Sequence, residues 1–245
     1  MANLKDHYDP WFRSFDMDYS DLDRANRFIS ELHRFEAAGV MPRLQILRLP
    51  NDHTAGTSAG KPTRTAYLAE NDLALGRVIE AISRSKFWPE TAVFVVEDDA
   101  QDGPDHVDAH RTIAYAISPW VRRCTVDSTL YSTTSMLRTM ELILGLRPMT
   151  PFDAAAMPMN ASFGTTCDPR PYTAVPARVD LRERNTSHAW GGRASGGMNF
   201  AKEDAVDDRL LSEIVWRSVR GPDSAMPAPR HAAFVRTTGS DRDHD

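Results

Sequence analysis

A short apolar run that leads straight into a cluster of acidic residues and histidines constrains the fold of this chain most. Residues 92–96, Ala-Val-Phe-Val-Val, are rich in β-branched and aromatic side chains and predict a buried strand. The next stretch, 97–111, carries six acidic residues and two histidines. Open α/β sheets bind their ligands at the carboxyl ends of such strands. Because so many carboxylates repel one another, we expect a cation or another bound group to hold part of this stretch together.

A second candidate strand, 44–49, also ends at a polar stretch. It is followed by Asp52, His53 and a loop of small residues. Residues 65–83, between the two strands, have apolar side chains at helical spacing, so the three segments predict a strand–helix–strand unit with parallel strands. Parallel strands end at one edge of a sheet. We therefore expect the polar residues that follow the two strands to meet there.

The remaining segments complete an α/β fold with a mostly parallel sheet flanked by helices. Apolar periodicity and stop signals predict a third strand at 112–118 and further helices at 21–38, at 133–144 and from 207 up to Gly221. We expect Asp21 to cap the first of these helices and Gly39 to end it. Residues 149–200 are rich in Pro, Ala, Thr, Ser and Gly and predict an irregular segment that wraps the domain. The polar residues 231–245 predict a disordered tail.

Charge, hydropathy and cysteine content narrow the classes of function. The net charge of -5 argues against general nucleic-acid binding, which usually needs a basic face. The chain holds no apolar run near the roughly 20 residues of a membrane span, and residues 1–7 show no signal-peptide core. Cys124 and Cys167 are too few for a disulfide scaffold; one bridge or two buried thiols remain, and we favour the thiols.

The acidic stretch does not fit the common structural metal motifs. A calcium-binding EF-hand loop that began at Asp98 would need a ligand at its third position and a glutamate at its twelfth, where this chain has Ala100 and Ala109. No cysteine lies nearby, which excludes a structural zinc site of the usual kind. A catalytic metal site and a solvated acidic loop are the remaining alternatives. The buried strand upstream and the interleaved histidines favour the metal site.

Within that site, the adjacent Asp98 and Asp99 are the first candidates for metal ligands, because both can reach one cation from a loop at the end of a strand. His106 is a further candidate for a ligand or a site-shaping residue. His110 lies four residues later and Arg111 follows it, so these two are candidates for the surrounding shell or for phosphate binding.

A nucleophile is harder to find in this sequence. It contains neither a Gly-x-Ser-x-Gly elbow nor a phosphate-binding loop of the Gly-x-x-x-x-Gly-Lys-Ser/Thr type. Thr54, Thr57 and Ser58 lie near His53, but nothing in the sequence marks one of them as activated.

Three motifs resemble a known family of phosphoesterases. They are Pro-Asn-Asp-His-Thr at 50–54, the Asp98-Asp99 pair and Asp-His-Val at 105–107. The family includes bacterial acid phosphatases and phosphatidylcholine-cleaving phospholipases C and belongs to the alkaline phosphatase superfamily. The likeness is greatest to bacterial phosphoesterase domains found behind a β-propeller, and it covers most of residues 4–230.

The resemblance implies metal-dependent hydrolysis of phosphate esters through a phosphorylated Ser or Thr. It implies an alkaline-phosphatase-like fold and one or two divalent metals, with zinc, manganese and calcium all open. The implied metal ligands are Asp98, Asp99 and His106, the implied catalytic residues are His53 and Asp52, and His110 and Arg111 would support the metal or bind phosphate.

The departures from the family pattern matter equally. The nucleophile and the early metal ligands of the family lie upstream, and no residue in 1–40 matches them. Residues 1–230 therefore resemble the C-terminal part of a phosphoesterase domain, so we expect an incomplete sheet and an inactive chain unless the missing N-terminal half or another chain completes it. The alternative is a non-catalytic remnant or binding module that keeps the fold only. Family members are commonly periplasmic or secreted, and the sequence leaves both the compartment and the ester substrate open.

Overall fold

The structure is a computed structural model and describes residues 4–98, 104–105, 107–203 and 205–231. Its elements are, in chain order, α1 (Asp21–Ala38), the short turn of 3-10 helix η2 (Pro50–His53), α2 (Arg64–Arg84), η3 (Trp88–Glu90), β1 (Val93–Val96), β2 (Ala114–Ile117), α3 (Thr133–Leu144), α4 (Pro151–Ala155), η4 (Asn160–Ser162), α5 (Gly192–Gly196) and α6 (Asp208–Arg220). The expected tail 231–245 lies outside the described residues from 232 onward.

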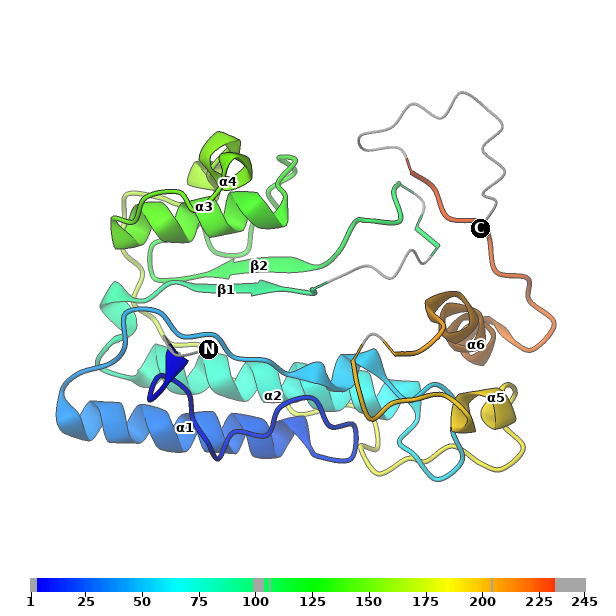
Figure 1. Ribbon diagram of the computed structural model, residues 1–245. Helices are drawn as coiled ribbons and strands as arrows, with labels where there is room; N and C mark the ends of the chain where they lie inside the picture. The colour runs from blue at the N-terminus through cyan, green and yellow to red at the C-terminus, as the bar shows by residue number, and fades with distance from the viewer. Residues whose placement is uncertain (1–3, 99–103, 106, 204, 232–245) are drawn as a thin grey trace.

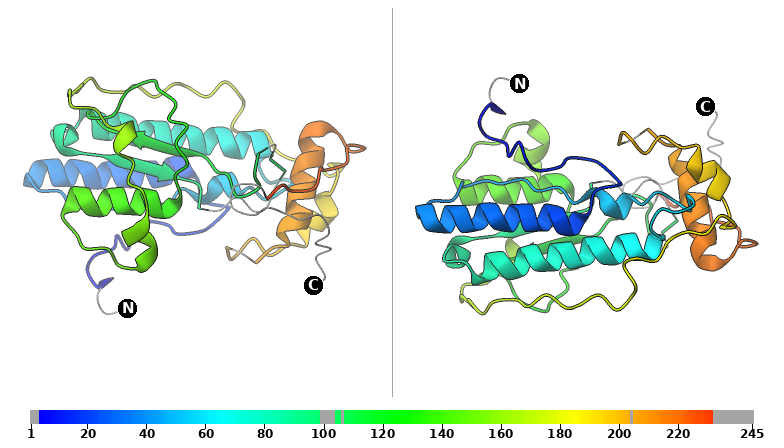
Figure 2. Two further views of the ribbon diagram at one scale, coloured as in Figure 1. Left: turned by 90° about the horizontal axis from the view of Figure 1, so that it is seen from above. Right: turned by 90° about the horizontal axis from the view of Figure 1, so that it is seen from below.

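These elements form three layers (Figure 1). Helices α1 and α2 lie side by side on one face of the sheet, and α3 and α4 lie over the opposite face. The short helices α5 and α6 stand together at one end of this stack, as the views from above and below also show (Figure 2). That end is where the candidate site lies.

Helix α1 has the predicted range, but its capping residue lies one position earlier than expected. The side chain of Ser20, not that of Asp21, caps the helix by accepting a hydrogen bond from the Leu22 N–H at 3.1 Å. The Asp21 carboxylate is completely buried and is used by other partners, described below. Gly39 ends the helix in the left-handed conformation at φ 78°, as the sequence predicted.

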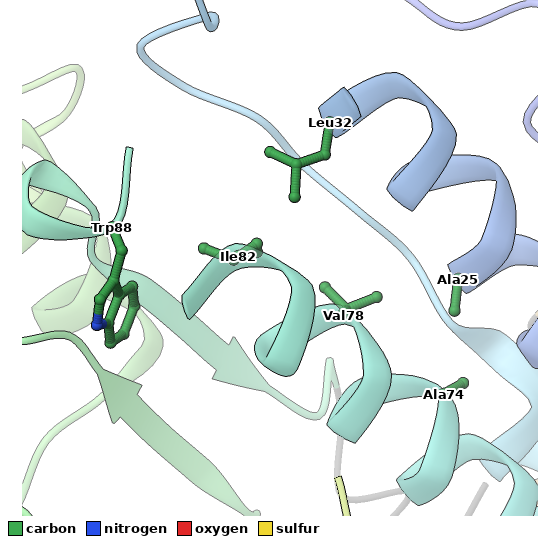
Figure 3. Packing of buried hydrophobic residues seen from close by; sticks show 6 residues of the cluster. All are labelled: Ala25, Leu32, Ala74, Val78, Ile82 and Trp88. Carbon is green, nitrogen blue, oxygen red and sulfur yellow. The ribbon is translucent and has the colours of Figure 1, made fainter. Parts of the chain in front are cut away.

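The main core lies between the first two helices and the turn that follows α2 (Figure 3). Its fully or nearly buried members are Ala25, Leu32, Ala74, Val78, Ile82 and Trp88. Two members of this cluster are alanines, Ala25 on α1 and Ala74 on α2, and both are completely buried. Small side chains at these positions let the two helices approach closely, so the layer forms a firm base for the sheet.

Residues 44–49 have the side-chain alternation of a strand but form no backbone ladder with any described residue. Leu47 and Leu49 pack against the main core, whereas Leu44 and Ile46 face solvent. Alternation needs only one buried face, but a ladder needs a neighbouring strand about 5 Å away. Residues 44–49 therefore alternate between buried and exposed side chains without pairing with a neighbouring strand among the described residues.

The described sheet consists of β1 and β2, which pair antiparallel with Val95 opposite Tyr115. Residues 44–49 and 92–96, which we predicted to be parallel strands of one sheet, do not pair with each other in the described part of the chain. The larger, mostly parallel sheet flanked by helices stays a prediction.

The segment 149–200 contains α4, η4 and α5, and its middle part runs along α2. The Tyr172 N–H donates to Ser83 near the end of α2 at 2.9 Å, and the Asn185 side chain donates to the Pro62 carbonyl just before α2 at 3.1 Å. The chain therefore follows the helix from its last turn back to its first. This path brings α5 and α6 to the end of the molecule where η2 lies.

Both cysteines are free thiols. Cys124 is exposed, so the expectation of a buried thiol is wrong at that position, and Cys167 is half-buried. Cys124 lies in an irregular stretch after β2 rather than in the core. Among the helices in the described part of the chain, none is both long and apolar enough to cross a bilayer.

Candidate active site

The turn η2 places Asp52 and His53 at the end of the extended run 44–49. Pro50 stands at its first position, where a missing N–H costs no hydrogen bond. Thr54 ends it with a positive φ of 61°, a conformation that a non-glycine residue rarely adopts. The surrounding polar residues therefore have to hold the backbone of this turn in its unusual conformation.

Asn51 anchors the turn from below. It is 1% exposed, and its N–H donates to the Asp21 carboxylate at 3.0 Å. Its side-chain amide donates to the Tyr19 carbonyl oxygen at 3.0 Å. The side chain of Asn71 on α2 donates both to Asp21 at 3.0 Å and to the Leu49 carbonyl oxygen at 2.8 Å. The turn is therefore tied to both helices of the base layer.

Arg24 completes this buried network. It is fully buried and forms an ion pair with Asp21 at 2.9 Å. Its guanidinium also donates, at 2.8–2.9 Å, to the carbonyl oxygens of Arg13, Ser14, Asp16 and Tyr19. A buried charge is tolerated only when it is paired and hydrogen-bonded, and here it is both. Arg24 thereby fixes the segment 13–19 against η2.

Asp52 lies within electrostatic reach of the acidic residues that follow β1. Its pKa is raised to about 6, first by burial and next by the negative charge of Glu97, with Asp21 and Asp98 adding to the effect. The residues that follow 44–49 therefore lie near those that follow β1, while the meeting of two parallel strands at one sheet edge stays a prediction. The roles of these residues in catalysis stay predictions.

His53 stands between two aromatic rings with one nitrogen unused. The rings of Phe15 and Phe200 meet the imidazole edge to face, with centroids at 5.5 and 6.0 Å. Nδ1 lies 3.0 Å from the Thr54 carbonyl oxygen, which accepts only, so Nδ1 carries the proton. Nε2 is buried and has no hydrogen-bond partner among the described residues. Its lone pair is therefore available to a cation or to a protonated phosphate oxygen.

Asp98 is exposed and pairs with a cationic side chain of the neighbouring segment. Arg48 contacts the Asp98 carboxylate at 3.3 Å and also forms an ion pair with Glu203. Its guanidinium lies over the ring of Phe15 at 5.8 Å. The pairing with Asp98 again joins the end of 44–49 to the end of β1.

Two predicted metal ligands, Asp99 and His106, lie outside the described residues. Of the predicted supporting residues, Arg111 pairs with Asp105 at 2.9 Å, which helps to lower the pKa of that carboxyl to about 2. His110 contacts the buried Asp108 through Nδ1 at 2.9 Å. Its ring also lies 4.9 Å from that of His231. The two residues thus stabilise the loop that carries the acidic cluster.

The donor set at this edge suits a divalent cation in kind. It offers carboxylates that repel one another around Asp52 and an imidazole nitrogen of His53 that has no partner in the described structure. In the part of the chain that the structure describes, however, no three His, Cys, Asp or Glu side chains are gathered closely enough to hold a metal. A complete ligand shell therefore needs donors beyond those described.

The hydroxyl groups nearest His53 are engaged in holding the turn. The Thr54 side chain accepts from the Gly56 N–H at 3.2 Å, and the Thr57 hydroxyl donates to the Trp190 carbonyl oxygen at 2.6 Å. Ser58 is nearly buried beside them. Among the described residues, neither threonine forms a hydrogen bond with a base that would activate it. In these contacts the two hydroxyl groups therefore have a structural role.

Sequence reasoning missed Arg24, Asn51 and Phe15. A signal was present for the first, because Arg24 interrupts the apolar stripe of α1 beside Ala25 and lies three residues after Asp21. Sequence reasoning also missed Asn71, whose side chain on α2 lies in the network under η2. Phe15 and Phe200 gave no signal, since only the fold brings them to His53.

Comparison with known proteins adds one finding. A model of the Phosphoesterase family matches residues 13–147, more than half of the chain. The matched span includes the buried network, η2 and β1 with the acidic stretch that follows it. No curated protein and no solved structure matches the chain.

Proposed function

Because the chain belongs to the Phosphoesterase family, we propose that it serves in the hydrolysis of phosphate esters and holds the phosphoryl group at the edge formed by η2 and the end of β1. One observation carries this assignment to the edge. The unpartnered Nε2 of His53 lies in the same turn as Asp52, whose pKa is raised first by burial and next by the acidic residues after β1. Such convergence of titratable groups is typical of functional sites.

The reaction exchanges one P–O bond for another. The bond between phosphorus and the alcohol oxygen breaks, the oxygen of a water molecule ends on phosphorus, and the alcohol leaves with a proton. We propose that this occurs in two transfers, the first to the hydroxyl of a Ser or Thr and the second from that residue to water.

We propose that Asp98 binds a divalent cation, zinc, manganese or calcium, together with Asp99 and His106. When bound, the cation would supply positive charge to the phosphoryl oxygens and lower the pKa of the attacking hydroxyl. Asp98 is exposed and held by Arg48. Because Arg48 also pairs with Glu203, it keeps a carboxylate partner when Asp98 turns to the cation.

His53 and Asp52 would act on the transferring group. The proton on Nδ1 of His53 is held by the Thr54 carbonyl, so Nε2 can accept a hydrogen bond from a protonated phosphate oxygen or bind the cation. The burial of Asp52 and its acidic neighbours keep its carboxyl protonated up to about pH 6, and a protonated carboxyl can donate to a phosphate oxygen. His110 and Arg111 would hold the loop that carries the metal ligands.

We propose that the nucleophilic Ser or Thr and the remaining strands of an alkaline-phosphatase-like sheet come from a segment outside this chain. The contacts of Thr54 and Thr57 support this, because in the described structure neither hydroxyl donates to a base that would take its proton. In that case residues 1–230 form the C-terminal part of the domain. The same observation favours a second candidate function, the binding of phosphate or metal without turnover.

Calorimetric titration of the purified chain with Mn²⁺, Zn²⁺ and Ca²⁺ tests the proposal, with hydrolysis of a chromogenic phosphate ester measured alongside. The key variant is the double change Asp98→Ala/Asp99→Ala. The matched control is Asp72→Ala/Asp223→Ala, which removes two exposed carboxylates from other parts of the surface.

If Asp98→Ala/Asp99→Ala loses metal binding and the control variant keeps it, the result supports the proposed metal site. Hydrolysis of the ester after the missing segment is added would show that the completed domain is an enzyme. Absence of metal binding by the folded chain would contradict the metal proposal and leave phosphate binding as the function. Hydrolysis by the chain alone would contradict the external nucleophile and return attention to Thr54, Thr57 and Ser58.

A further inference from the structure

A cavity of about 710 Å³ adjoins the candidate site. It lies between the segment 13–18, the turn after η2, and the stretch from α5 to 201. Two of its walls are Phe15 and Phe200, the same rings that enclose His53. A molecule whose phosphoryl group lies at His53 would therefore extend past these rings into the cavity. Its volume is within the usual range for small-molecule sites, roughly 300–1,000 Å³.

The walls of the cavity offer apolar surface. Its two cationic residues are each paired with a carboxylate. Aromatic, thioether and methyl groups line it, from Phe15, Met17, Ala55, Met198 and Phe200. Arg13 and Lys61 also line it, and each forms an ion pair within the same wall, with Asp16 and Asp18. Because these cations are neutralised where they stand, the cavity favours a neutral group over an anionic one, and its aromatic and methionine side chains offer that group apolar contact beside the polar residues of the lining.

The floor of the cavity is a fixed structure. Gly56 approaches α5 so closely that a Cβ atom there would lie 2.5 Å from the Ser195 hydroxyl oxygen. The fully buried Ser195 accepts from the Thr57 N–H at 3.1 Å. The side chain of Asn185 donates to the carbonyl oxygens of Gly56 and Ser58 at 3.3 and 3.2 Å. A cavity held open in this way takes a ligand without first ordering its own wall.

We propose that this cavity receives the alcohol part of a phosphate ester, and that this part is a neutral aromatic or aliphatic group rather than a polyol or a charged headgroup. The proposal rests on the proposed function, because it assumes a phosphoryl group at His53. Phe15, Phe200 and the methionines beside them would then determine which phosphate esters bind. The far wall, 192–201, lies outside the span matched by the family.

Equilibrium binding to the full chain, in buffer with Mn²⁺, tests this with three probes: inorganic phosphate, glycerol 3-phosphate and phenyl phosphate. We expect phenyl phosphate to bind at least about tenfold more tightly than the other two, since burial of an aromatic ring is worth that much or more. The variant Ala59→Trp fills the cavity from its rim, and Ala194→Trp places the same side chain on the exposed face of α5 outside it.

The expected result is that Ala59→Trp removes the preference for phenyl phosphate and leaves the affinity for inorganic phosphate unchanged, while Ala194→Trp changes neither. Equal affinity for all three probes, or a preference that Ala59→Trp leaves intact, would overturn the cavity assignment while the phosphate site stands. If none of the three probes binds, the proposed function itself fails and the cavity assignment falls with it.

Discussion

A single buried arginine determines much of the geometry around the candidate site. Arg24 uses its whole guanidinium to hold the segment 13–19 and pairs with Asp21, which in turn binds the N–H of Asn51 in η2. The residues that carry the chemistry, Asp52 and His53, follow directly on this anchor. Their position is therefore set by polar contacts that no apolar periodicity would reveal.

The change Arg24→Met tests the strength of this anchor. It leaves the Asp21 carboxylate buried without its ion pair, so we expect the free energy of unfolding to fall by about 3–5 kcal/mol. The control is Arg27→Met, which removes a half-buried ion pair with Asp9 and should cost about 1 kcal/mol or less. Urea unfolding measures both. Equal losses in the two variants would refute the special role of Arg24.

Asp52 gives the site a pH dependence with a defined sign. Its pKa in the folded chain is about 6, above the value of about 4 in an unfolded chain. Stability from this group is fully present below about pH 4 and is lost as the pH rises through 6, because the folded state then carries an unfavourable charge. Above pH 6 the ionised carboxylate therefore destabilises the chain.

The change Asp52→Asn removes that charge. In buffer with a chelator, we expect the variant to exceed the wild type in unfolding free energy by about 1–2 kcal/mol at pH 8, a value reduced for partial exposure, and to equal it at pH 4. Asp72→Asn, at an exposed position on α2, serves as the control. A difference that does not vary with pH would show that Asp52 ionises as an ordinary surface carboxyl.

At the scale of elements, periodicity and stop signals located most helices and both described strands. Helix α1 ends at Gly39 and α3 at Gly145 as predicted, because a left-handed glycine is a strong local signal. Strand β1 follows from its run of β-branched and aromatic residues. Pairing was less predictable, since a ladder depends on which segment lies alongside, and 44–49 shows alternation without a partner among the described residues.

Two glycines in the base layer should respond oppositely to the same substitution. Gly39→Ala should cost about 1 kcal/mol, because φ is 78° there although the nearest atom to an added Cβ is 4.0 Å away. Gly76→Ala, inside α2, should gain about 0.5–1 kcal/mol, since its Cβ would meet Ala174 at an ordinary 3.6 Å. Thermal unfolding midpoints compare them, and shifts in the same direction would be inconsistent with this account.

At the scale of the whole molecule, the site lies where segments far apart in the sequence meet. The turn η2, the end of β1 and the stretch around Phe200 reach one end of the layered stack (Figures 1 and 2). We expected the first two together on the basis of parallel strands that end at one edge, and that arrangement of strands stays a prediction. The third could not be predicted, since the segment that carries it has no period and follows α2 through isolated backbone and side-chain hydrogen bonds.

The central claim is that one cation site joins the end of 44–49 to the end of β1, and paramagnetic broadening by Mn²⁺ in amide NMR spectra tests it most directly. At low Mn²⁺ the account predicts that the amide signals of Asp52 and His53 broaden together with those of Glu97 and Asp98, and that Asp98→Ala abolishes both effects. Broadening at only one of these segments, at unrelated acidic residues, or at none would contradict it.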